Sequence, residues 1–129
     1  SKEEAEKTLI ENKIVILVGG LGNPLFTTDS TASVRAVELN SDIMLKATTV
    51  DGIYSDDPKI NKKAIKYDFL TFDEAITKNL KVMDQTSLCF CRDNNLDVRV
   101  FNADSQGAIL EAITNENTKI GTLVRLKND

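Results

Sequence analysis

The stretch GGLGNPLFTTDS, Gly19–Ser30, decides the fold expected for this chain, because it joins an apolar run to a helical pattern. The run before it, Ile14–Val18, reads IVILV and lacks the alternation of a half-exposed strand. Such a continuous run is typical of a strand covered on both faces in a parallel sheet. Thr31–Leu39 has the pattern of a helix, and Ile43–Leu45 that of a second buried strand. The order strand, glycine turn, helix, strand predicts a βαβ unit.

Helical and extended patterns continue to alternate through the rest of the chain. A long loop at Ala47–Asp68 contains the turn signals Asp51-Gly52 and Asp57-Pro58, and so long a loop in a small domain is more often a binding loop than a plain connection. The alternation predicts a single α/β domain with a mainly parallel sheet. The other elements expected are helices at Glu3–Asn12 (with Ala5, Leu9 and Ile10 inward), Thr71–Lys78 (begun by a capping box), Gln85–Asn94 and Ser105–Ile113, and strands at Val98–Phe101 and Ile120–Val124.

Composition and charge narrow the classes of function. The 129 residues are 41% hydrophobic and 28% charged with a formal net charge of -4, which gives no basic footprint for nucleic acid or an anionic membrane. The longest apolar run, Ile14–Val18, is far short of the roughly 20 residues that cross a bilayer. We therefore expect a cytoplasmic protein that binds neither nucleic acid nor membrane.

The residue types that are present restrict the chemistry. The chain has no histidine, which removes the commonest metal ligand and the usual general base. Its two cysteines, Cys89 and Cys91, point to different faces of a helical stretch and are expected to be free thiols. Carboxylates, lysines, hydroxyls and backbone amides remain, a set that suits phosphoryl transfer, where positioning and charge neutralisation do most of the catalysis.

The glycine turn has two interpretations from its residues alone. It is neither a Walker A loop, since no Gly-Lys-Ser/Thr follows, nor a dinucleotide fingerprint, since Leu25 stands where a glycine is needed. Glycines before a helix allow backbone amides to approach an anion, with Thr27 and Thr28 as further donors; a tight, capped turn without a ligand explains the same residues. Asp29, or Ser30, is the expected helix cap, and Asp29 is equally a candidate carboxylate of a phosphate site.

The same ambiguity holds for other polar residues. Asp84 precedes a helix and fits either a cap or a functional carboxylate. The acidic residues of the long loop do not match a calcium-binding EF-hand loop, so a nucleotide-binding loop and a solvated turn both stay open. Lys46, at the end of its strand, is placed either to neutralise a phosphate or to lie on the surface.

Together, these segments closely resemble the C-terminal half of the bacterial uridylate kinases, within the amino acid kinase family. The resemblance rests on GNPLFTTDSTA (Gly22–Ala32), LKATTVDGIYSDDP (Leu45–Pro58), LKVMD (Leu80–Asp84), RVFN (Arg99–Asn102) and GTLV (Gly121–Val124). It implies a three-layer αβα sandwich, of which residues 1–129 would be an incomplete, C-terminal, ATP-binding portion.

The resemblance also implies a reaction and its residues. The reaction would be transfer of the γ-phosphoryl group of ATP, with Mg²⁺, to UMP, giving UDP. Asp29 and Asp84 would be the catalytic carboxylates, Asp84 less directly, and no residue is assigned as a direct metal ligand. The UMP site would comprise Leu21, Gly22, Asn23, Pro24, Leu25, Phe26, Thr27 and Thr28, and the ATP site Lys46, Thr48, Tyr54 and Asp57.

Two departures from the family pattern limit this expectation. Leu21 stands where a threonine is usual, so one hydroxyl contact to UMP would be missing, and Leu25 replaces a common phenylalanine. The family's N-terminal half, with a catalytic lysine, most UMP phosphate contacts and the hexamer interface, has no counterpart here. We expect the chain alone to be inactive and the full-length protein to be a homo-oligomer, a hexamer. A non-catalytic nucleotide-binding or regulatory module, or a kinase for an amino acid, are the alternatives.

Overall fold

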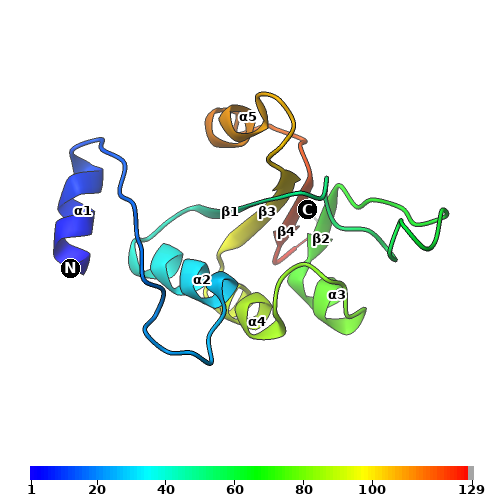
Figure 1. Cartoon of the computed structure of the whole chain (residues 1–129), viewed down its shortest axis with the longest axis horizontal. Helices are drawn as coiled ribbons and strands as arrows, with labels where there is room; N and C mark the ends of the chain where they lie inside the picture. Colours follow the sequence, from blue (N-terminus) through cyan, green and yellow to red (C-terminus); the bar gives the residue numbers. More distant parts are fainter. Residues whose placement is uncertain (128–129) are drawn as a thin grey trace.

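The computed structural model describes residues 1–127, in which helices cover both sides of one sheet (Figure 1). The sheet has four strands in the order β1-β3-β4-β2. The pairs β1–β3 and β2–β4 are parallel, and β3–β4 is antiparallel. The α/β fold with a mainly parallel sheet is therefore confirmed. In chain order the elements are α1 (Lys2–Ile10), α2 (Thr28–Glu38), β1 (Ile43–Thr48), β2 (Phe69–Thr71), α3 (Phe72–Thr77), α4 (Gln85–Asp93), β3 (Asp97–Asn102), α5 (Ala108–Thr114) and β4 (Thr122–Arg125).

The core lies between the sheet and the helices α2, α3 and α4, which lie together on one side, with α5 on the other (Figure 1). Strand β3 is buried at the four successive positions Val98–Phe101, Arg99 included, as expected for a strand with neighbours on both edges. Helix α3 begins with the expected capping box, in which Thr71 and Glu74 each bond the other's backbone amide. Its buried face contributes Phe72 and Ala75 to the core.

The prediction of a strand at Ile14–Val18 is wrong. These residues have no regular structure, and Ile14 and Val18 are 91% and 87% exposed. Within residues 1–127, no backbone group of another segment forms a hydrogen bond with these residues. The segment therefore lacks the neighbouring strand that a β-sheet requires. The buried face expected for α1 is also wrong, since the helix has no buried residue and stands apart from the sheet (Figure 1).

Smaller corrections concern the caps and one strand. Helix α2 begins at Thr28 with Thr27 as its N-cap, so Asp29 and Ser30 lie in its first turn instead of capping it. Helix α5 follows Gly107, and Ser105 is not its cap. The short strand β2 was not expected, because its three residues lie between a loop and a helix start and show no periodicity. No helix in the described part of the chain is long and apolar enough to cross a membrane.

Candidate functional site

Asp29 and Lys46 form an ion pair between α2 and β1. Asp29 lies in the first turn of α2 and Lys46 in the second half of β1, and Lys46 Nζ donates to Asp29 Oδ2 at 2.7 Å. The two side chains keep about a quarter of their surface exposed, 27% for Asp29 and 25% for Lys46. The pair is therefore accessible to a ligand at the carboxyl end of a parallel strand, where open α/β sheets bind ligands.

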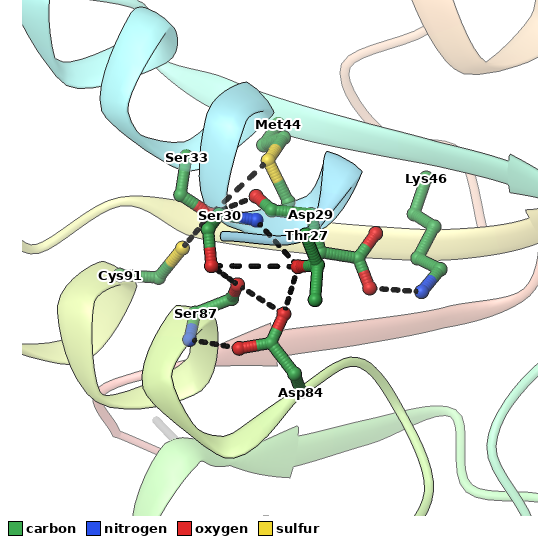
Figure 2. A network of polar contacts seen from close by, with 9 residues as sticks. All are labelled: Thr27, Asp29, Ser30, Ser33, Met44, Lys46, Asp84, Ser87 and Cys91. Atoms are coloured by element: carbon green, nitrogen blue, oxygen red, sulfur yellow. Dashed lines mark hydrogen bonds and ion pairs between the residues drawn. The ribbon is translucent and has the colours of Figure 1, made fainter. Parts of the chain in front are cut away.

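A ring of hydroxyls and one carboxylate joins the beginnings of α2 and α4 (Figure 2). Thr27 Oγ1 accepts from the Ser30 amide at 3.1 Å and donates to Asp84 Oδ2. Asp84 in turn caps α4, because the Ser87 amide donates to Oδ1 at 2.9 Å and the Ser87 hydroxyl to Oδ2 at 2.7 Å. The Ser30 and Ser87 hydroxyls are 3.1 Å apart and close the ring.

The electrostatics of the ring keep Asp84 ionised. Burial acts to raise the pKa of Asp84, but hydrogen bonds from Thr27 and Ser87, together with the charge of Lys46, outweigh it and hold the pKa below its ordinary value. Cys91, next to the ring, behaves in the opposite way: burial raises the pKa of its thiol, although its hydrogen bond to Ser33 opposes the rise. Both cysteines are free thiols, as expected, and Cys91 is fully buried.

The glycine turn, Gly19–Thr27, lies open to solvent on the other side of Thr27. Asn23 organises it, accepting from the Leu25 amide through its side chain at 2.9 Å and from the Phe26 amide through its carbonyl at 3.2 Å. Leu25 is 87% exposed and Phe26 47% exposed, whereas Leu21 is partly buried. The turn is thus held in shape by polar contacts while its apolar side chains stay uncovered.

A hollow of about 850 Å³ lies between the long loop and the turn that follows α3. Tyr54 and Asp57, both expected at the ATP site, line it, and the Tyr54 hydroxyl donates to the Asp51 carboxylate at 2.9 Å. Lys46 and Thr48 do not line it, although the loop wall begins at Thr49, directly after β1. The structure thus divides the expected ATP residues between the hollow and the strand that leads to it.

Lysines that the sequence analysis gave no role also line the hollow. Lys78 and Lys81 are on the turn after α3, and Lys59 is on the long loop. Lys81 belongs to the LKVMD segment, so the signal was present in the motif, but one exposed lysine in a turn has no pattern of its own. The same hollow is lined by Asp51, Asp56 and Asp57, so lysines that suit a polyanionic ligand stand beside an equal number of carboxylates.

Comparison with known proteins identifies the family. The model of the amino acid kinase family matches residues 1–102. The chain belongs to the amino acid kinase family. Among its relatives are the uridylate kinases of Alcanivorax borkumensis, 48% identical over 93% of this chain, and of Coxiella burnetii, 49% identical over 95%. These matches cover only 47% and 50% of the relatives, so the chain spans about half their length.

Solved structures of UMP kinases have the same fold as this amino acid kinase chain. The enzyme from Bacillus anthracis superimposes with a TM-score of 0.92 at 39% identity, and that from Ureaplasma parvum with 0.88 at 43%. Each match covers 97% of this chain and 51% or 53% of the other. The resemblance inferred from the motifs is thereby confirmed.

Carboxylates are the candidate Mg²⁺ ligands in this chain. No group of three or more metal-binding side chains occurs among residues 1–127. A Mg²⁺ ion that arrives with a nucleotide needs only one or two protein carboxylates, because phosphates and water supply the other ligands. Asp29 fits that role, since only Oδ2 is paired with Lys46, whereas both Asp84 oxygens accept hydrogen bonds from the protein.

Proposed function

We propose that this chain is the ATP-binding portion of a UMP kinase, which transfers the γ-phosphoryl group of ATP to UMP and gives UDP. The observation that carries the proposal is the Asp29–Lys46 pair, which joins the helix start after the glycine turn to β1, the strand that leads to the hollow. The glycine turn with Thr28 would bind the acceptor, and the hollow would bind ATP. The relatives named uridylate kinase support this choice of acceptor.

Charge neutralisation explains the lysines around the hollow. Two phosphate-bearing substrates repel each other, so cations must cancel charge before the γ-phosphoryl group meets its acceptor. Lys46 lies in the second half of β1, and Lys59, Lys78 and Lys81 line the hollow. Mg²⁺ bound with ATP would supply further positive charge, and Asp29 would orient Lys46 and that ion. Tyr54 and Asp57 would contact the nucleotide from the loop wall.

The chain also needs a partner to complete the site. It spans about half the length of its relatives. The exposed apolar segment Ile14–Val18 has no regular structure, and its backbone groups find no backbone partner among residues 1–127. A strand from the remainder of the full-length protein would bond to this segment and bury it. On this proposal the chain alone binds ATP but does not transfer phosphate, and the oligomer assembles only from the full-length protein.

The test uses Mg-ATP titration of the chain and activity of the full-length protein. We expect the chain to bind Mg-ATP, and Asp57→Asn and Lys81→Gln to weaken binding about tenfold, the effect of losing one charged contact. Asp73→Asn is the matched control, because Asp73 is exposed and pairs with Arg92 away from the hollow. No binding by the chain at millimolar Mg-ATP would contradict the ATP site.

The acceptor is tested separately in the full-length protein. We expect UDP from UMP and ATP, and loss of that activity in Asp29→Asn. Phosphorylation of an amino acid in place of UMP would contradict the acceptor, and nucleotide binding without any transfer would indicate a regulatory module of the same fold.

A further inference from the structure

We propose that Asp84 and Ser87 are positioning residues that fix the direction of the Thr27 hydroxyl and, through Thr27, the glycine turn. The family resemblance implies a less direct catalytic role for Asp84, but its two oxygens already accept from protein donors: Thr27 Oγ1, the Ser87 amide and the Ser87 hydroxyl. Its contacts therefore tie α4 to the acceptor side of the site. Ser87 was assigned no role by the motifs.

The hydrogen-bond directions in the ring follow from the charge of Asp84. An ionised carboxylate only accepts, so the Thr27 and Ser87 hydroxyls must both donate to it. The Ser87 proton is then used, and Ser30 must be the donor in the contact between the two serine hydroxyls. Thr27 Oγ1, having given its proton to Asp84, presents lone pairs to the Ser30 amide. One carboxylate thus sets the orientation of the whole ring.

The buried half of this ring gives it a rigid base. Ser30 is 5% exposed and Ser87 is fully buried, whereas Asp84 is partly buried and Thr27 is exposed at the edge of the glycine turn. A buried polar network that is fully satisfied strongly favours one arrangement, because every alternative leaves a buried group unpaired. Figure 2 shows Asp84 and Ser87 on one side of Thr27 and the Asp29–Lys46 pair on the other. The ring therefore fixes the start of α2, and with it Asp29, from the side of Thr27 opposite the Asp29–Lys46 pair.

Hydrogen exchange of the protein without ligand tests the ring directly. We expect Ser87→Ala and Asp84→Asn to speed amide exchange about tenfold in residues 19–31, as expected for loss of one charge-assisted bond. Exchange in residues 72–78 should stay unchanged. Thr71→Val is the matched control, because it removes the N-cap hydroxyl of α3 instead, and it should speed exchange only in residues 72–78. Equal exchange in residues 19–31 of wild type and Ser87→Ala would overturn the proposal.

Kinetics of the full-length protein provide a second readout, which rests on the proposed function. Ser87→Ala should raise the KM for UMP about tenfold and leave the KM for ATP unchanged. Thr27→Val should raise the KM for UMP by a similar factor, because it removes the hydroxyl that donates to Asp84. In the double variant Thr27→Val/Ser87→Ala the effects should be less than additive. A rise in the KM for ATP alone would overturn the positioning role. If UMP is not a substrate, the proposed function fails while the exchange experiment still decides the ring.

Discussion

Two regions of the molecule place side chains against their hydropathy, in opposite ways. One is the junction between α2 and α4, and the other is the N-terminal arm (residues 1–26). At the junction, Ser33 and Ser87 are fully buried although they are polar. In the arm, Ile14 and Val18 are 91% and 87% exposed although they are apolar. The difference lies in the partners: each buried serine has a hydrogen-bond acceptor or donor within the described fold, and the arm has no second strand there. Position follows from available partners as much as from side-chain type.

Replacing a glycine by alanine should give the largest difference in unfolding free energy between the packed sheet and the arm. Gly121 has φ 65°, and a Cβ there would lie 1.9 Å from the Val100 carbonyl oxygen. Gly22 has φ 73°, and a Cβ added there would meet no atom of residues 1–127 within 4 Å, apart from its chain neighbours. We expect Gly121→Ala to lower the free energy of unfolding by about 4 kcal/mol or more and Gly22→Ala by about 1 kcal/mol. Denaturant unfolding measures both, and equal losses would contradict the packing at Gly121.

Truncation of apolar side chains should give the next largest contrast. Phe72 is fully buried, so Phe72→Ala should cost about 3 kcal/mol or more of unfolding free energy. Ile16 is 83% exposed, and Ile16→Ala should change it by less than about 0.5 kcal/mol. A large loss from Ile16→Ala would mean that the arm is packed in solution. In the full-length protein the Ile16 effect should grow, because the partner strand would bury this residue.

Much of the fold could be predicted from sequence, because local signals agree with packing there. The capping box at Thr71 and Glu74, the β-branched and aromatic residues of β3 and the helix after Asp84 are each determined by neighbouring residues. The run Ile14–Val18 failed for the opposite reason. Its apolar pattern indicates a strand, but a strand requires a pairing partner, and none lies within residues 1–127.

The candidate site was predictable as a set of residue types and less so as an arrangement. The motifs identified Asp29, Lys46 and Asp84, but not that Asp29 pairs with Lys46 while Asp84 bonds Thr27. Those contacts join residues that are distant in sequence, so no local sequence pattern predicts them. Ser87 was missed because a serine in the first turn of a helix is ordinary. Its function depends on the side chains that α2 brings opposite it.

Ion pairs should show a smaller difference between the two regions. Lys46 and Asp29 are about a quarter exposed, whereas Lys13 and Glu11 in the arm are 64% and 43% exposed. We expect a double-mutant cycle of Lys46→Gln with Asp29→Asn to give a coupling energy of up to about 1 kcal/mol. The Lys13→Gln and Glu11→Gln cycle should give roughly zero, since solvent screens that pair. Equal coupling energies would contradict the partial burial of the first pair.

The smallest effect expected is a pH dependence confined to the junction. The pKa of Asp84 lies below its ordinary value of 3.8, so the folded state prefers the ionised form more than the unfolded chain does. Its stabilisation is complete above about pH 4 and is lost as the pH falls through the lower, folded-state pKa. Glu4 also has a lowered pKa, through its hydrogen bond with the N-terminal ammonium group, but it is fully exposed on α1. In acid titrations of unfolding, Asp84→Asn should therefore flatten the loss of stability below pH 4, and Glu4→Gln should leave it unchanged. If Glu4→Gln flattened the curve as much, the arm would unfold together with the core, and the contrast between the two regions would not hold in solution.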